Sequence, residues 1–225
     1  MPRQPRFEHP GAIYHVLNRG NYRSAIFETT GAKKALLCTL GETAEKLGWR
    51  VHAWAIMANH YHAAIETPQA NLVEGMKHWQ GTFAVRFNRM RDERGHIFQG
   101  RYKSLRVDPV GGLGPLCHYI HLNPVRAGVC SLKTLNRWPW TSLVWLGNVS
   151  ARPTWYTPDA ALRHAGLPRD DRSSHNRYLR YLGNLAADEA SQKALQFESM
   201  SKGWVVGSEA FKESLVEEHQ ELRER

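Results

Sequence analysis

Two histidines, His60 and His62, flank Tyr61 within the short apolar run of residues 58–66. Successive side chains of a β-strand point to opposite faces, so in a strand these histidines share one face and Tyr61 takes the other. Two strand positions span about 6.6 Å, which lets both imidazoles converge on one metal ion. The same pattern also fits two half-buried histidines that form hydrogen bonds on a sheet, and the rest of the chain has to distinguish these interpretations.

Tyr119 and Asn123 form a second pair that could do chemistry. They lie four positions apart, so on a helix they share one face. A tyrosine beside an amide oxygen, facing a two-histidine site, would be a nucleophile next to a third metal ligand. Pro124 lacks a backbone N–H and disfavours helical geometry at Asn123, so either a kink aims Asn123 inward or the helix ends there. The alternative for Tyr119 is a core tyrosine with a satisfied hydroxyl.

The composition is typical of a globular protein with a substantial core. Apolar residues make up 42% of the 225 residues, and the eight Trp, eight Tyr and seven Phe argue against disorder. The first residues lack the apolar segment of a signal peptide, and no run reaches the length of a membrane span. Three cysteines without Cys-x-x-Cys spacing indicate free thiols in a reducing compartment. These features predict a cytoplasmic protein.

The positive charge is concentrated in the part of the chain that holds these candidate residues. Residues 1–130 contain 17 Lys and Arg against 9 Asp and Glu, whereas residues 131–225 contain 13 against 12. A basic face suggests a polyanionic partner, nucleic acid first. A merely soluble basic surface is the alternative, and charge counting does not exclude it.

Hydrophobic periodicity predicts the elements that must position these side chains. We expect strands over residues 12–18, 49–57 and 97–107, and a further strand that starts at the histidines. Helical spacing predicts helices over residues 30–47, 72–91 and 115–128. The order β-α-β-β-α-β is that of the ferredoxin-like split βαβ fold, an α+β class in which an antiparallel sheet carries helices on one face. The helix with Tyr119 follows this core.

The chain is expected to divide near residue 130. Residues 1–130 would form the catalytic domain, and residues 131–225 would form an extension that packs on it. Trp138, Trp140 and Trp145 are candidate packing anchors. Helices are predicted over residues 176–187 and 208–225.

Several ordered motifs carry a resemblance to a known family. They are Tyr14-His15-Val16 with Arg19-Gly20-Asn21, Asn59-His60-Tyr61-His62, residues 95–103 (GHIFQGRYK), residues 119–128 (YIHLNPVRAG), residues 138–142 (WPWTS) and residues 207–211 (GSEAF). With these motifs the chain resembles the single-tyrosine HUH transposases, and within them the REP-associated tyrosine transposases. The resemblance covers nearly the whole chain and implies the same ferredoxin-like core. One departure is Ala58, because relatives usually carry proline at this position. The difference alters the turn before the histidines and changes none of the expected metal ligands.

The resemblance implies a role for each candidate residue. His60, His62 and Asn123 would be metal ligands, and Tyr119 would be the nucleophile. Two imidazoles and one amide oxygen make a neutral site with open positions, which suits Mg²⁺ or Mn²⁺ together with phosphate oxygens. Attack by Tyr119 would leave a 5′-phosphotyrosine and a free 3′-OH, so the strand could be rejoined without a nucleotide cofactor.

The resemblance also suggests the substrate and the cellular setting. The substrate would be single-stranded or hairpin DNA such as a repetitive extragenic palindrome, and the protein would act near the bacterial nucleoid as a monomer or homodimer. Cations that track phosphates, interleaved with rings that stack bases, fit such DNA. The predicted DNA-binding residues are Arg19, Arg86, Arg89, Arg101, Lys103, Arg106 and Arg126. Phe83, Phe87 and Phe98 fit the core better, and Tyr102 is a rival nucleophile for which we favour stacking or packing.

Two other functions remain open. The chain could be a hairpin-binding protein that kept the fold and lost or repurposed catalysis, although the intact set of His60, His62, Tyr119 and Asn123 argues against this. It could also be a two-histidine metal hydrolase that uses water, but that leaves Tyr119 and the basic face unexplained.

Overall fold

A five-stranded sheet is the centre of this computed structural model, which describes residues 8–224, with side chains described up to residue 221. The ferredoxin-like core consists of β1 (Ala12–Arg19), α1 (Thr30–Leu47), β2 (Arg50–Ile56), β3 (His60–Thr67), α2 (Leu72–Arg91) and β4 (Lys103–Val107). The strand order is β2-β3-β1-β4-β5, and the first four strands are antiparallel. This order confirms the predicted α+β, ferredoxin-like fold.

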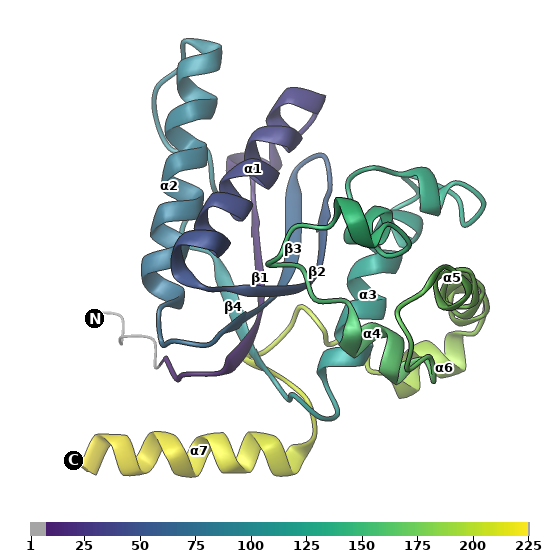
Figure 1. The fold of residues 1–225 in the computed structure, drawn as a ribbon. Helices are drawn as coiled ribbons and strands as arrows, with labels where there is room; N and C mark the ends of the chain where they lie inside the picture. The colour runs from purple at the N-terminus through teal and green to yellow at the C-terminus, as the bar shows by residue number, and fades with distance from the viewer. Residues whose placement is uncertain (1–7, 225) are drawn as a thin grey trace.

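Helices cover both faces of the sheet. Helices α1 and α2 lie on one face, and α3 (Leu113–Arg126) lies on the other together with the helical segments that follow it (Figure 1). Tyr61 points to the α2 face, where its ring centroid is 4.7 Å from that of Trp79. His60 and His62 therefore point to the α3 face, as the alternation of side chains requires. Because both faces are covered, β2 and β3 are almost entirely buried.

The fourth strand is shorter than its sequence predicts. The expected strand over residues 97–107 begins only at Lys103. Before it, Phe98 forms an isolated bridge with Gly20, and Gly100 has a φ of +71°, which breaks the extended backbone. The segment 97–102 therefore loops past the end of β1 before the chain enters the sheet.

The residues after α3 wrap the α3 face and return to the sheet. The short helices α4 (Asp159–His164) and α6 (Glu189–Ala194) flank the longer α5 (Arg172–Ala187), and all three precede β5 (Val205–Val206), which pairs in parallel with β4. Helix α5 starts four residues earlier than predicted, because the Asp171 side chain accepts a hydrogen bond from the backbone N–H of Ser174 and caps it.

The final helix, α7 (Glu209–Glu224), runs along the lower edge in Figure 1. Its predicted end at residue 225 lies outside the described residues, as do residues 1–7, the segment in which we expect no signal peptide. No helix in the described part of the chain is long and apolar enough to cross a bilayer.

The segment after α3 shares one hydrophobic core with the sheet. Leu143, Leu182 and Phe197 belong to the same cluster of buried residues as the strands. Trp145, one of the predicted anchors, packs its ring against Trp54 of β2, with centroids 5.2 Å apart. The boundary near residue 130 stays a prediction.

Gly75 on helix α2 provides a test of how tightly this helix packs on the core of the protein. A Cβ atom on Gly75 would overlap the ring of Trp49, whose Nε1–H is already held by Asn71 Oδ1 at 2.8 Å. We expect Gly75→Ala to lower the free energy of unfolding by about 1–3 kcal/mol, because the buried ring has to move. Urea unfolding measures this change.

Gly81 is the matched control on the same helix. A Cβ atom there meets nothing within 4 Å, so Gly81→Ala is expected to raise the free energy of unfolding by about 0.5–1 kcal/mol. Equal effects of the two substitutions would contradict the packing described for Gly75.

Candidate active site

A cavity of about 820 Å³ on the α3 face of the sheet collects the predicted catalytic residues. His60 and His62 reach it from β3, and Tyr119 and Asn123 reach it from α3. The structure thus brings together residues that are about 60 positions apart in the chain. Tyr119 and Asn123 are each only 8% exposed, so both side chains are largely shielded from bulk solvent.

The two histidines and the tyrosine lie in direct ring contact. The ring centroids of His60 and His62 are 5.1 Å apart with their planes nearly perpendicular, and those of His62 and Tyr119 are 5.7 Å apart. Convergence of two imidazoles beside a phenol is the arrangement that the sequence predicted for this face of β3.

Hydrogen bonds hold one nitrogen of each histidine. His60 Nδ1 donates to Asn59 Oδ1 at 2.7 Å, and the His60 side chain also forms a hydrogen bond with Asn123. His62 Nδ1 lies 2.9 Å from Nε2 of His15, a buried histidine of β1. Each Nδ1 is therefore occupied, so Nε2 is the nitrogen of each ring that could bind a ligand, and on His60 a metal ion would take the place of the hydrogen bond with Asn123.

Burial keeps these imidazoles neutral. Desolvation lowers the pKa of His62 well below its ordinary value, and the neighbouring His15, His60 and Arg126 act in the same direction. Burial also lowers the pKa of His60, partly offset by the hydrogen bond to Asn123. Metal binding needs a neutral imidazole with a free lone pair, so this environment suits a ligand role at neutral pH.

The Tyr119 side chain is fixed from two sides. Its hydroxyl is 2.9 Å from Ser201 Oγ, and the Arg126 guanidinium lies 5.1 Å from the centre of its ring. Arg126 also lies over the ring of Phe197. A cation over an aromatic face is attracted to it, so Arg126 holds the phenol in place while adding positive charge beside the cavity.

Pro124 does not end the helix. Helix α3 continues through Pro124 to Arg126, so the alternative in which it stops at Asn123 is wrong. Asn123 keeps its position one turn beyond Tyr119, and both side chains line the same cavity.

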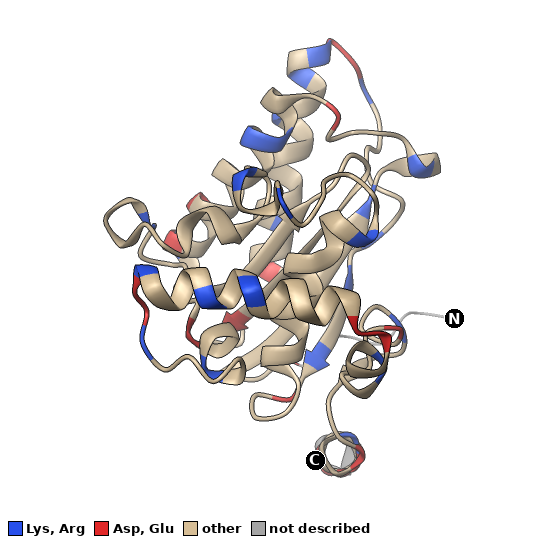
Figure 2. Ribbon diagram, turned by 90° about the vertical axis from the view of Figure 1, so that its right-hand side faces the viewer, with Lys and Arg blue, Asp and Glu red and all other residues tan. Residues whose placement is uncertain are grey.

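The predicted DNA-binding residues fall into two groups. Arg19, Arg101 and Lys103 line the cavity, and Arg126 lies over Tyr119. The others lie elsewhere: Arg86 pairs with Glu42 at 2.8 Å, Arg89 is exposed on α2, and Arg106 lies over the ring of Tyr14. Figure 2 shows that Lys and Arg also occupy other elements, including α5, the helix that crosses the front of that view. DNA contacts by Arg86, Arg89 and Arg106 stay predictions.

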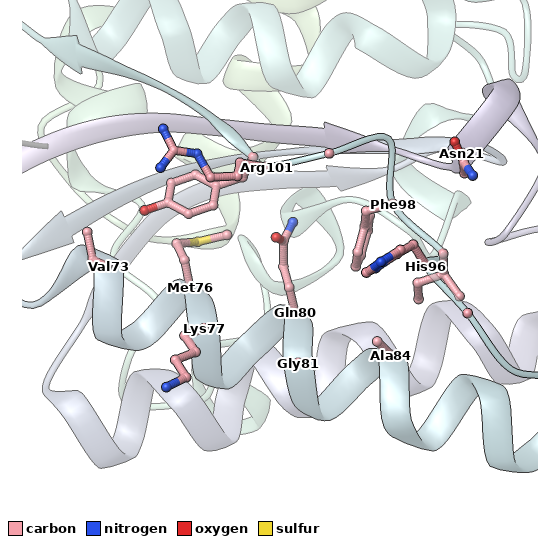
Figure 3. Close-up of a pocket in the computed structure, with 14 residues that line it drawn as sticks. Asn21, Val73, Met76, Lys77, Gln80, Gly81, Ala84, His96, Phe98 and Arg101 are labelled. Carbon is pink, nitrogen blue, oxygen red and sulfur yellow. The ribbon is translucent and has the colours of Figure 1, made fainter. Parts of the chain in front are cut away.

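A second cavity, of about 720 Å³, lies between α2 and the segment 95–102 (Figure 3). Gln80 projects into it from α2, and its amide donates to the Tyr61 hydroxyl at 2.6 Å. Tyr102 lines this cavity. The structure therefore places Tyr119, and not the rival Tyr102, beside the histidine pair. Phe83 and Phe87 are buried in the core, and Phe98 packs against it, as expected.

Three residues of the site were not singled out from the sequence. His15 belongs to the quoted Tyr14-His15-Val16 motif, but only the pairing of β1 with β3, which sets Leu17 opposite His62, puts His15 on the face of the cavity. Met200 and Ser201 carry no local signal, because they reach the site only through the path of the extension.

The donor set at the cavity is consistent with a divalent cation. In residues 8–224, no group of three or more His, Cys, Asp or Glu side chains is arranged to hold a metal ion. A site here would therefore use His60 and His62 with the amide oxygen of Asn123. Two neutral nitrogens and one neutral oxygen could hold a divalent cation and leave positions open for phosphate oxygens, but the imidazoles do not by themselves select Mg²⁺ or Mn²⁺, which prefer oxygen ligands.

Comparisons with known proteins identify the class. The family described as "Transposase IS200 like" matches residues 9–123, just over half of the chain, including both histidines, Tyr119 and Asn123. The chain belongs to the IS200-like transposase family. No curated protein matches the chain.

One solved structure supports the fold. The structure of a REP-associated tyrosine transposase bound to a REP hairpin is similar, with a TM-score of 0.54 at 18% sequence identity over 71% of this chain and 93% of that chain. A putative transposase from Deinococcus radiodurans covers 56% of this chain and 92% of that chain at 19% identity, and its TM-score of 0.38 is too low to support a conclusion. The family model confirms that the chain is a relative of the transposases, and the similar structure confirms the fold.

Helix α3 also carries two histidines that face away from the cavity. His118 Nδ1 and His121 Nδ1 both contact the Tyr178 hydroxyl, at 2.8 and 2.9 Å. His118 Nε2 contacts His164 Nδ1 at 3.0 Å, and His121 Nε2 contacts Ser142 Oγ at 2.8 Å. These histidines join α3 to the extension and are part of the core.

The buried histidines make stability depend on pH. Burial, with repulsion from His164 and His121, lowers the pKa of His118 well below its ordinary value of about 6.5. The unfolded chain then binds more protons than the folded protein below pH 6.5, so the free energy of unfolding falls as the pH falls. From pH 7 to pH 5, one such histidine lowers it by about 2 kcal/mol.

We expect His118→Gln to remove that contribution and to make the pH dependence shallower. Urea unfolding of both proteins at pH 7 and pH 5 provides the measurement. An equal loss of stability on acidification in both would show that His118 titrates normally in the folded protein.

Proposed function

We propose that this transposase nicks and rejoins single-stranded or hairpin DNA, with Tyr119 as the nucleophile and a Mg²⁺ or Mn²⁺ ion held by His60, His62 and Asn123. The observation that carries the proposal is the shared cavity, where the Tyr119 ring lies 5.7 Å from that of His62. A phenol elsewhere on the surface could not reach a phosphate bound at the histidine pair.

In the proposed reaction one bond on phosphorus replaces another. The Tyr119 oxygen attacks the phosphodiester, the bond from phosphorus to the 3′ oxygen breaks, and a 5′-phosphotyrosine and a free 3′-OH remain. One proton leaves the phenol and one is gained by the 3′ oxygen. The reverse attack by a 3′-OH rejoins the strand, because the phosphotyrosine preserves the cleaved linkage.

The protein groups orient the reactants. Ser201 forms a hydrogen bond with the Tyr119 hydroxyl, and Arg126 holds the ring from its face. Arg19, Arg101 and Lys103 line the cavity and would attract the phosphates of a bound strand. A divalent cation at His60, His62 and Asn123 would offset the charge that builds on the phosphate oxygens.

Hairpin DNA is the substrate that the similar structure favours. The REP-associated tyrosine transposase with the same fold was solved bound to a REP hairpin. For this chain, REP-like hairpins are therefore the first substrates to test. The monomeric or dimeric state, with the tyrosine acting in its own or the partner subunit's cavity, is part of the same proposal.

Tyr119→Phe tests the nucleophile directly. Incubation of the protein with 5′- and 3′-labelled hairpin DNA and Mn²⁺, followed by a denaturing protein gel, should show a covalent protein–DNA adduct. We expect the adduct and the cleavage product to disappear in Tyr119→Phe, because the attacking oxygen is gone, while DNA binding persists. Chelation with EDTA should also abolish the adduct.

Tyr102→Phe is the matched control, because Tyr102 lines the other cavity and its variant should still form the adduct. Cleavage that survives Tyr119→Phe would favour a metal hydrolase that uses water. Hairpin binding by the wild-type protein without any cleavage would favour a repurposed DNA-binding protein.

The two groups of basic residues are expected to contribute differently to DNA affinity. Arg101 is exposed and lines the cavity, so Arg101→Ala should weaken hairpin binding and reduce the salt slope by about 1. Arg86 is already paired with Glu42 on α1, so Arg86→Ala should change affinity less. Fluorescence anisotropy over a range of salt concentrations measures both, and a larger effect of Arg86→Ala would place the DNA along α2 instead.

A further inference from the structure

His15 is a buried histidine with two hydrogen bonds that connect the candidate metal site to the C-terminal extension. It lies on β1, opposite Ala64 of β3, and its side chain is 0% exposed. Its Nδ1 is 2.8 Å from the carbonyl oxygen of Met200, and its Nε2 is 2.9 Å from Nδ1 of His62. Its ring stacks on that of His62, with centroids 5.1 Å apart.

The direction of these hydrogen bonds follows from the chemistry of the partners. A carbonyl oxygen can only accept, so Nδ1 of His15 carries a hydrogen and donates it to Met200. Complete burial favours the neutral imidazole, in which Nε2 has no hydrogen and must accept. Nδ1 of His62 is then the donor, and Nε2 of His62 keeps a free lone pair.

We propose that His15 is a positioning residue that holds His62 in the tautomer and orientation needed for a metal ligand, and that the main chain of Met200 in turn orients His15. This inference rests on the proposed metal site. The second hydrogen bond of a ligating histidine usually fixes its tautomer and ring orientation, which gives such outer partners a measurable effect on metal affinity.

Through Met200 and the residue after it, the extension contacts the candidate active site. Met200 lies 185 positions from His15 and outside the family-matched residues 9–123. The next residue, Ser201, contacts the Tyr119 hydroxyl, and its carbonyl oxygen accepts a hydrogen bond from Lys103 at 2.7 Å. One short segment therefore contacts both the nucleophile and the residue that orients a metal ligand.

A purely structural role for His15 predicts a different effect of its replacement. If His15 only filled the core, its replacement would change stability without selecting a tautomer of His62. A direct measurement of where the ring proton of His62 resides separates these two roles.

The first measurement is the ring ¹⁵N spectrum of the full chain, which distinguishes imidazoles protonated at Nδ1 from those protonated at Nε2. The His62 signals are assigned by their absence in His62→Asn. We expect His62 to be protonated at Nδ1 in the wild-type protein and to shift toward the Nε2 form in His15→Leu. A wild-type His62 protonated at Nε2 would overturn the proposal without any variant.

The second measurement is Mn²⁺ affinity, followed by the electron paramagnetic resonance signal of the free ion. We expect His15→Leu to weaken binding by about 10- to 100-fold. His15→Gln can still accept from His62 through its side-chain oxygen, so it should recover part of this loss, and it provides a second variant if His15→Leu does not fold.

His52→Leu is the matched control. His52 is also a buried histidine of the sheet, but its Nε2 contacts Glu66, and it does not belong to the residues that line the active-site cavity. Its replacement should leave Mn²⁺ affinity within about 3-fold of the wild type, well below the 10-fold minimum expected for an outer partner of a ligand. Equal losses in His15→Leu and His52→Leu would show that any buried histidine of the sheet matters equally, which would overturn the proposal.

Failure of the metal site and failure of this inference give different results. A wild-type protein that binds no Mn²⁺, or that still binds it in His60→Ala, would overturn the proposed metal site. Mn²⁺ binding that is lost in His60→Ala but unchanged in His15→Leu and His15→Gln would overturn the role of His15 alone.

Discussion

The alternation of side chains along β3 is the constraint on which the rest of this structure depends. The strand lies between β2 and β1 in the sheet, with Leu17 opposite His62 and Arg19 opposite His60. Tyr61, Ala63 and Ile65 fill the core under α1 and α2, and the histidines are left for the other face. A slip of one residue in the register would exchange the two faces, so the apolar packing of the strand also keeps the histidines at the cavity.

The opposite face is completed by elements that come later in the chain. Helix α3 packs on β2 and β3 and presents Tyr119 and Asn123 to the histidines. The extension then returns to the edge of the sheet, where Arg106 donates its backbone N–H to the carbonyl oxygen of Trp204 and β5 pairs with β4. This pairing carries Met200 and Ser201 into the site. The extension is therefore part of the geometry of the candidate active site as well as a cover for the core.

Buried histidines serve two purposes on this face. His118 and His121 share the hydroxyl of Tyr178 and connect α3 to α5, deep in the core. His60 and His62 instead line the cavity, where Nδ1 of each ring is held by a neighbour. Both groups are kept neutral by burial, and they differ in what the second ring nitrogen faces. For His118 and His121 it is a side chain of the extension, whereas for His60 and His62 it is the cavity that also holds Asn123.

The sequence by itself determined the order of the elements, the shared face of His60 and His62, the four-residue spacing of Tyr119 and Asn123, and the family. These are local patterns, since each depends on residues only a few positions apart. The tertiary structure alone decided that His15 and the segment around Met200 join the site, that the strand expected from residue 97 begins at Lys103, and that Arg86 and Arg106 lie away from the cavity. These features depend on contacts between distant parts of the chain and on which face a side chain takes after packing, and no local periodicity encodes either.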